Sequence, residues 1–290
     1  MSEHSPEVLN EIESLIKKNS FEIHFQPILA PSEGRIVSVE ALCRFEAGLL
    51  ARHRLSVAEV VRLFEQKGVA ADFDLAVIDR TLTLLRDLRD RTGLTLPVSV
   101  NLCASSLGAP QFVTRLKRQL LKHGMEPARL QLEISEAALV DREVYQAVIP
   151  RLVEAGVGCA IDNFISGHTD FGMLTSPLVK TIKVDRAVTA SLADSEMARR
   201  FLRGLLMLVE SMNKRLVMKG VETREQFRFL EAIGCNQYQG YIFAGPMPVR
   251  ELPEFVRRFT QSPRDAIFSE DRNQGSEEHL GLTHPDHRTR

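Results

Sequence analysis

The sequence predicts an α/β fold, a barrel of eight strands surrounded by helices in which the first strand runs antiparallel to the second. Two observations predict this class. Short runs of β-forming residues alternate with longer stretches whose apolar residues recur at helical spacing, the pattern of parallel strands joined by helices. The first two runs, in contrast, are separated only by residues 30–35, which are rich in turn-forming residues. These two runs should therefore pair as an antiparallel hairpin.

Eight runs have the composition of strands. In chain order they are Glu22–Leu29, Ile36–Arg44, Pro97–Leu102, Arg129–Ile134, Val157–Ile161, Thr181–Val184, Arg215–Met218 and Gln237–Gln239. Residues 56–91 and 196–212 carry apolar side chains at helical spacing, and most other gaps are long enough for a helix. Eight strands and about seven helices in roughly 240 residues fit a modified TIM (β/α)8 barrel with an antiparallel first strand.

The expected organisation is a single barrel domain with a short segment at each end. A helix over residues 1–20, with Val8, Ile12 and Leu15 on one apolar stripe, leads into a barrel over residues 21–260. Residues 261–290 form a polar tail. Its composition predicts a disordered, solvated segment, with a segment that docks a partner as the alternative.

The composition excludes several classes of function. Charge is nearly balanced, with 37 Lys and Arg against 38 Asp and Glu, so the basic character expected for binding polymeric nucleic acid is missing. No stretch approaches the roughly 18 apolar residues that span a bilayer, and the first 20 residues are too polar for a signal peptide. The four cysteines show no C-x-x-C spacing, which indicates buried, reduced thiols. We therefore expect a cytoplasmic protein without a membrane partner.

Polar residues at the carboxyl ends of the predicted strands are the candidates for function, because a barrel of this kind gathers its chemistry there. They are Glu40, Asn101, Glu133, Asp162, Lys183, Lys219 and Gln239. For any one of them, an edge residue bonded to a loop amide is the simpler interpretation. Seven such residues at one rim favour a functional site.

The oxygen ligands among these candidates are of the kind that Mg²⁺ or Mn²⁺ prefers. Glu40, Glu133 and Asp162 supply carboxylates, and Asn101 supplies an amide oxygen. No comparable set of His and Cys accompanies them. Neither a G-x-G-x-x-G nor a G-x-x-x-x-G-K-[ST] loop occurs, which disfavours nucleoside triphosphate chemistry.

Short motifs in a characteristic order carry a resemblance to a known family. They are FEIHFQPI at 21–28, EALCR at 40–44, VNL at 100–102, LEISE at 132–136, IDNF at 161–164, IKVDR at 182–186, GVET at 220–223 and QGYIFAGP at 239–246. With these motifs the chain resembles the EAL domain family of cyclic di-GMP phosphodiesterases, over about residues 10 to 258.

The resemblance implies a ligand, a mechanism and residue roles. In active members two divalent cations, held by an asparagine and several carboxylates, generate a hydroxide that opens cyclic di-GMP to a linear dinucleotide. By resemblance Lys183 and Glu136 are the catalytic residues, with Lys183 steadying the water and phosphate and Glu136 bracing the loop after Asp162. The implied metal ligands are Glu40, Asn101, Glu133 and Asp162. The implied ligand-binding side chains are Gln26, Arg44, Asn101, Asp162, Lys183, Glu222 and Gln239.

Two positions depart from the family's pattern of metal ligands. Asn163 stands where active members carry a second aspartate, and Lys219 stands where they carry a glutamate. An ammonium group has no acceptor, and its repulsion from a dication about 4 Å away would be about 8 kcal/mol at an effective dielectric near 20. Ile165 also replaces a glycine of the following loop, which removes backbone freedom there.

We therefore expect a degenerate EAL-domain protein that lacks phosphodiesterase activity. It would act as a receptor for cyclic di-GMP or as a regulator that binds an unknown protein partner, with a homodimer as a further option. The alternative is an active metal-dependent phosphodiesterase that produces linear pGpG. Mg²⁺ or Mn²⁺ is expected at most at a partial site, with no metal as the other option. The Lys219 ammonium is expected to take the place of the second cation among Glu40, Glu133 and Asp162.

Overall fold

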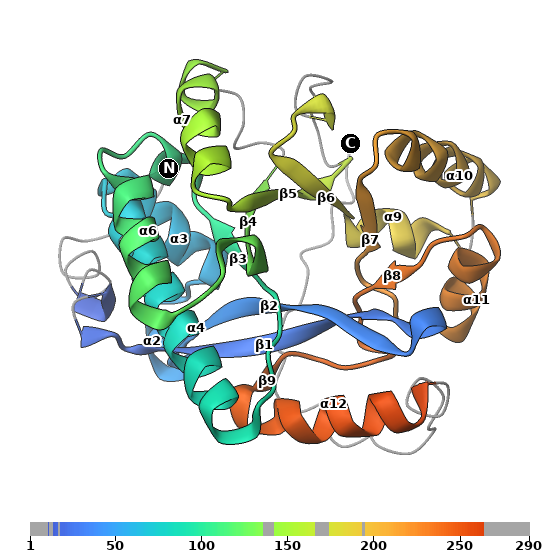
Figure 1. Cartoon of the computed structure of the whole chain (residues 1–290), viewed down its shortest axis with the longest axis horizontal. Coiled ribbons are helices and arrows are strands. Elements are labelled where there is room, and N and C mark those ends of the chain that lie inside the picture. Colours follow the sequence, from blue (N-terminus) through green and yellow to red (C-terminus); the bar gives the residue numbers. More distant parts are fainter. Residues whose placement is uncertain are drawn as a thin grey trace.

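Eight strands close into a barrel in the computed structural model, which describes residues 11, 14–16, 18–135, 142–165, 174–192 and 195–263 (Figure 1). The barrel strands are β1 (Phe21–Ala30), β2 (Arg35–Phe45), β3 (Val98–Leu102), β4 (Leu130–Ser135), β5 (Gly158–Phe164), β6 (Val179–Val184), β7 (Arg215–Met218) and β8 (Gln237–Tyr238), and an additional short strand, β9 (Met247–Pro248), pairs with β1. Parallel pairs run from β2 through β8, and β1 closes the barrel antiparallel to both β8 and β2. The predicted barrel with an antiparallel first strand is confirmed.

Helices surround the strands, as Figure 1 shows. They are α2 (Ala47–His53), α3 (Val57–Gln66), α4 (Ala70–Thr92), α5 (Ala104–Leu107), α6 (Phe112–His123), α7 (Arg142–Glu154), α9 (Arg186–Ser191), α10 (Glu196–Ser211), α11 (Arg224–Ala232) and α12 (Leu252–Gln261). Short 3-10 turns lie at Pro31–Glu33, Pro127–Arg129 and Val249–Glu251. Local sequence sets several helix starts. Ser56 and Glu59 form a capping box at α3, and Thr223 and Gln226 form another at α11.

Two features differ from the predicted elements. The helical pattern over 56–91 is divided between α3 and α4, because the backbone at Gly68 is left-handed, with a φ of 69°. The second is β9, which pairs with His24 and Phe25 of β1 through only two residues. A strand of two residues that includes Pro248 has no alternation for a sequence pattern to reveal.

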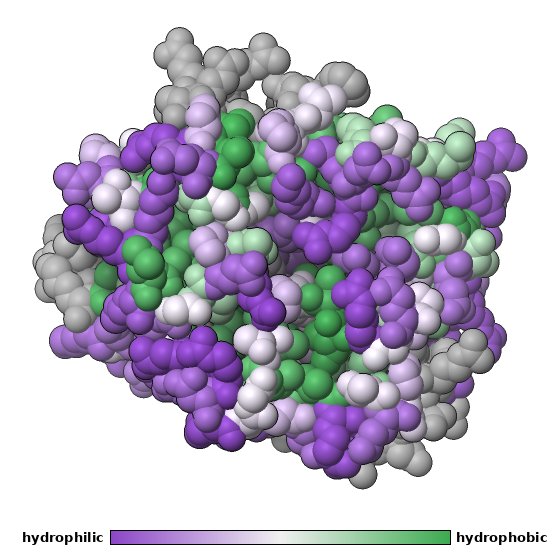
Figure 2. Space-filling model, viewed as in Figure 1, coloured by the Kyte–Doolittle hydropathy of each residue, from purple (hydrophilic) through white to green (hydrophobic). Residues whose placement is uncertain are grey.

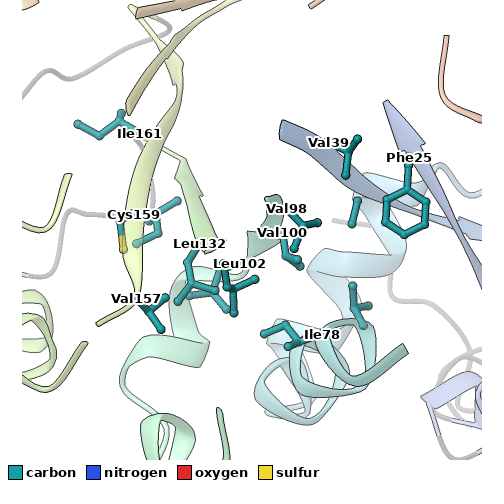
Figure 3. Close-up of a cluster of buried hydrophobic side chains, with 14 of the residues drawn as sticks. Phe25, Val39, Ile78, Val98, Val100, Leu102, Leu132, Val157, Cys159 and Ile161 are labelled. Carbon is teal, nitrogen blue, oxygen red and sulfur yellow. The ribbon is translucent and has the colours of Figure 1, made fainter. Parts of the chain in front are cut away.

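The hydrophobic core lies between the sheet and the helices. Val98, Val100 and Leu102 of β3 alternate with polar neighbours and are buried on the side of the strand that faces Ile78 of α4 (Figure 3). Leu132 of β4, like residues of β5, belongs to the same cluster. Alternation along each strand therefore turns the polar residues into the barrel.

The face of the molecule drawn in Figure 2 is mostly hydrophilic, with smaller hydrophobic patches between the polar side chains. Within the described part of the chain, no helix is long and apolar enough to cross a bilayer. All four cysteines are free thiols, three buried and Cys43 partly buried. The predicted helix over 1–20 lies mostly outside the described residues, and so does the predicted tail beyond residue 263.

Candidate functional site

Most of the predicted site residues occupy inward positions of the barrel, toward the end at which the parallel strands finish. Asn101 and Glu133 are register partners in β3 and β4, and Gln26 and Glu40 are register partners in β1 and β2. The remaining candidates are Asp162 in β5, Lys183 in β6, Lys219 directly after β7, and Gln239 directly after β8. The barrel thus brings residues far apart in the sequence to one end of its interior.

Lys183 lies at the centre of this cluster. Its side chain is buried, and its Nζ donates to Glu40 Oε2 at 2.6 Å and to Glu133 Oε1 at 2.5 Å. Both carboxylates are buried with it. A buried ammonium held by two carboxylates is favourable only because each charge has a partner at hydrogen-bond distance.

Glu40 has donors on both of its carboxylate oxygens. Asn101 Nδ2 donates to Oε1 at 3.0 Å, and Gln239 Nε2 donates to Oε2 at 2.7 Å beside the bond from Lys183. Gln239 Nε2 also lies 3.1 Å from Gln26 Oε1, and Gln26 Nε2 donates to the carbonyl of Ala244 at 3.1 Å. Glu40 of β2 is therefore bonded directly to β3, to β6 and to the residue that follows β8.

The pKa values of Glu40 and Glu133 are shifted in opposite directions. Burial works to raise the pKa of Glu40, but the charges of Lys183 and Lys219 outweigh it and lower the pKa to about 2. Burial and the neighbouring charge of Glu40 raise the pKa of Glu133 to about 7. Glu133 Oε2 is buried and has no hydrogen-bond partner within the described residues. The lysine charges thus favour the ionised form of Glu40, while burial beside Glu40 favours the protonated form of Glu133.

A second ion pair lies beside the first. Lys219 Nζ donates to both oxygens of Asp162, at 2.7 and 2.9 Å, and lies 3.2 Å from Asn163 Oδ1. The Lys219 side chain is 20% exposed, and that of Asp162 is 7% exposed. The backbone of Lys219 is held as well, because Thr189 Oγ1 donates to the Lys219 carbonyl at 2.7 Å.

The backbone after Asp162 adopts left-handed conformations. Asn163 has a φ of 52°, which asparagine tolerates, and Ile165 has a φ of 79°. A β-branched residue at such a φ is strained, whereas glycine is not. The side chain at position 165 therefore conflicts with the backbone geometry that this turn adopts.

Two predicted residues, Arg44 and Glu222, lie outside the network, and a third, Glu136, is not among the described residues. Arg44 is partly exposed, and the hydrogen bond recorded for its guanidinium is from Nη1 to the carbonyl of Cys43, at 3.0 Å. Glu222 is exposed, and its backbone amide donates a hydrogen bond to Gln226 Oε1 at 2.9 Å.

Asp74 of α4 supports the site, and the sequence interpretation missed it. It is buried and accepts hydrogen bonds from the amide of Cys103 at 2.8 Å and from Ser106 Oγ at 2.6 Å. These bonds anchor the turn that follows Asn101. An aspartate inside the apolar run of α4 was the available signal, since a buried carboxylate needs partners.

Gly240 allows a close backbone contact next to Gln239. A Cβ there would lie 2.1 Å from the carbonyl oxygen of Val221 and 2.4 Å from its nitrogen. The amide of Val221 donates to the carbonyl of Gln239 at 3.2 Å. The segment after Lys219 is thereby joined to the end of β8.

The donor set does not fit a pair of divalent cations. Both oxygens of Glu40 and both oxygens of Asp162 accept from protein donors. Two ammonium groups stand among three carboxylates, so the local charge is already nearly balanced. Within the described residues, no group of three or more His, Cys, Asp or Glu has the arrangement of a metal site. Glu133 Oε2 is the buried carboxylate oxygen that remains available for a single ion.

Comparison with known proteins gives a consistent result. The model of a family described as "EAL domain" matches residues 9–246. The cyclic di-GMP phosphodiesterase NbdA of Pseudomonas aeruginosa is 31% identical over 261 residues, which cover 87% of this chain and 32% of NbdA. The chain thus spans about a third of the length of that curated relative.

Solved structures agree in fold. The PaMucR phosphodiesterase in complex with c-di-GMP is 27% identical with a TM-score of 0.75, covering 85% of this chain and 99% of that one. A manganese/cy-diGMP complex of Klebsiella pneumoniae BlrP1 is 26% identical with a TM-score of 0.70, covering 79% of this chain and 56% of that one.

Proposed function

This chain belongs to the EAL domain family, and on that premise we propose that it is a receptor for cyclic di-GMP that does not hydrolyse it. Two relatives described above were solved with this dinucleotide, which supports the choice of ligand. The chain would hold the ligand across the carboxyl ends of its strands. Its response would follow from binding alone.

The observation that carries the proposal is the ion pair between Lys219 and Asp162. Lys219 occupies both oxygens of a carboxylate that the family resemblance makes a metal ligand. An ammonium group neutralises that carboxylate but cannot activate water as a metal ion does. The second departure, Asn163, contributes a neutral oxygen 3.2 Å from the same ammonium. An ammonium group of the protein thus balances the negative charge of Asp162, but it cannot supply the water activation that a pair of metal ions would provide.

Ligand binding is proposed to depend on Lys219 and Arg44, the two cations that lie outside the buried cluster of Lys183, Glu40 and Glu133. Lys219 is partly exposed, and Arg44 retains guanidinium donors beyond its bond to Cys43. A phosphodiester carries one negative charge, and the planar guanidinium can contact two phosphate oxygens. Arg44 is therefore the proposed main contact with a phosphate of the dinucleotide.

Calorimetric titration of the full chain with cyclic di-GMP in metal-free, chelator-containing buffer tests the receptor proposal. We expect saturable binding that Arg44→Ala weakens by about ten- to a hundredfold, the loss of one charge-assisted contact. Arg62→Ala, at an exposed arginine on α3, is the matched control and should bind like wild type. No binding without metal refutes the receptor proposal, and an unaffected Arg44→Ala variant refutes the assigned contact.

The alternative is a phosphodiesterase that works with one metal ion, and the free Glu133 Oε2 is the observation that favours it. Incubation with cyclic di-GMP and Mg²⁺ or Mn²⁺, followed by chromatography, measures the linear product pGpG. We expect no turnover. Robust turnover that Glu40→Ala abolishes would overturn the proposed lack of activity.

A homodimer is a second proposal, supported by the exposed face of α10. Met197, Phe201 and Leu208 lie on one side of this helix and are 74%, 47% and 42% exposed. One such stripe can pack against its own copy about a two-fold axis. Analytical ultracentrifugation should find a wild-type dimer, a monomeric Phe201→Glu variant and a dimeric control, Leu121→Glu on α6. A monomeric wild type refutes this proposal.

A further inference from the structure

The amino ends of the strands line a cavity at the end of the barrel opposite to the carboxylates. Its volume is about 120 Å³, several times the roughly 10–15 Å³ that one water molecule needs on the same measure. One wall is apolar and comes from Ile28, Val37 and Val217. The polar wall consists of Ser38, Ser99, Gln131, Thr181 and Gln237. None of the described residues that line the cavity is acidic.

Three cations, Arg129, Lys180 and Arg215, also line the cavity. Arg129 is paired with Glu126 at 3.3 Å. Lys180 and Arg215, in contrast, are exposed, and their side chains have no hydrogen-bond or ion-pair partner within the described residues. Arg215 is exposed at the rim, where partial desolvation and the nearby charge of Arg35 lower its pKa.

A register irregularity directs Lys180 to this cavity. Cys159 pairs with Val179 and Ala160 pairs with Thr181, so Lys180 is an extra residue on β6. Such a bulge re-aims a side chain. The stem of Lys180 crosses Gly158, where an added Cβ would lie 3.4 Å from Lys180 Cγ. A side chain at position 158 would therefore compete for space at the cavity.

Ser99 supplies an independent observation inside the cavity. Its side chain is buried, with the residue only 2% exposed, and its Oγ has no partner within the described residues. A buried hydroxyl group without a partner is costly, and a ligand oxygen in the cavity would satisfy it. Gln131 and Thr181 are already bonded to each other at 3.0 Å.

We propose that this cavity is a binding site for a small oxyanion, held by Arg215 and Lys180 at its rim and by the hydroxyl group of Ser99 inside. The guanidinium and ammonium groups match the charge and geometry of such an anion. The apolar wall limits the space around the oxygens, which favours a compact anion. This site is separate from the proposed cyclic di-GMP site and does not depend on that proposal.

Titration of the full chain with inorganic phosphate, at an ionic strength held constant with chloride, tests the site. We expect saturable binding by calorimetry that Arg215→Gln weakens about tenfold or more. Ser99→Ala should weaken it less, since a neutral hydrogen bond is lost. Gly158→Val, which fills the cavity without removing a charge, should abolish it. Arg228→Gln, at an exposed arginine of α11, is the matched control and should bind like wild type.

Two outcomes overturn the proposal. One is the absence of saturable phosphate binding by wild type. The other is binding that persists unchanged in both Arg215→Gln and Gly158→Val, since the anion would then lie elsewhere, for example at the proposed dinucleotide site. Each variant is first compared with wild type by circular dichroism and urea unfolding. If Gly158→Val fails to fold, Ser99→Val replaces it as the cavity-filling variant.

Discussion

Replacing Lys219 by glutamate, together with Asn163→Asp, should convert a site balanced by an ammonium group into one that requires a divalent cation. Lys219 Nζ lies 2.7 and 2.9 Å from the oxygens of Asp162, at a partly exposed position. At an effective dielectric near 20 the attraction of such a pair is about 6 kcal/mol, and solvent screening reduces it to about 2 kcal/mol.

The new carboxylates add repulsion to that loss. The repulsion is limited, because a glutamate can instead take up a proton, which at pH 7 costs about 4 kcal/mol for an ordinary pKa near 4.3. In chelator the double variant should therefore lose about 2 to 6 kcal/mol of unfolding free energy. For a domain of this size that is a fall in Tm of about 5 to 20 °C.

Manganese should return part of this stability. An ion at a hundred times its dissociation constant stabilises the folded state by about 2.7 kcal/mol. Thermal unfolding with and without Mn²⁺, together with the stoichiometry of bound Mn²⁺, is the assay. The control Lys219→Gln removes the charge without adding a carboxylate, so it should lose stability and respond to Mn²⁺ less than the double variant. If wild type responds as strongly as the double variant, or the double variant gains nothing, the surrogate-charge reasoning is wrong.

Three further outcomes are expected from denaturant unfolding. Burial raises the pKa of Asp74 to about 6, above its ordinary 3.8; the wild type should therefore lose about 3 kcal/mol from this group as pH rises from about 4 to 6. Asp74→Asn should lack that loss, and parallel pH profiles for the two proteins would contradict the assignment. Gly240→Ala should destabilise by about 1 to 3 kcal/mol, because its Cβ would meet the backbone of Val221. Gly204→Ala on α10, where an added Cβ meets nothing within 4 Å, should instead stabilise by about 0.5 to 1 kcal/mol, and an equal effect at both glycines would refute the close-contact argument.

The barrel was predictable because its two signals are local. The turn over 30–35 is too short for a helix, and short β-forming runs such as those around Val98 and Leu130 alternate with longer stretches of helical spacing. The break between α3 and α4 was not predictable from apolar spacing, since Val69 continues the pattern and only the backbone at Gly68 departs from it. A helix boundary that is set by backbone conformation is therefore hard to detect from the spacing of apolar residues.

The membership of the candidate site followed from strand ends and from the family resemblance, but its pairing did not. We expected Lys219 among all three carboxylates, whereas its hydrogen bonds reach only Asp162 and Asn163. Lys183 pairs with the two glutamates instead. Which ammonium group reaches which carboxylate depends on distances across the barrel, and spacing along the chain carries no such information.

The polar interior of the barrel has a consequence for how this protein can change. The strands are held to the helices by outward residues such as Val100 and Leu132, while the inward residues of the same strands carry charge and hydrogen bonds. A substitution on the inner face therefore leaves the hydrophobic contacts of the fold intact, provided that its charge is balanced nearby. An aspartate or glutamate can give way to an amide or an ammonium group while the scaffold persists. Catalytic capacity and structural integrity are then separable properties of one barrel, and selection can act on each alone.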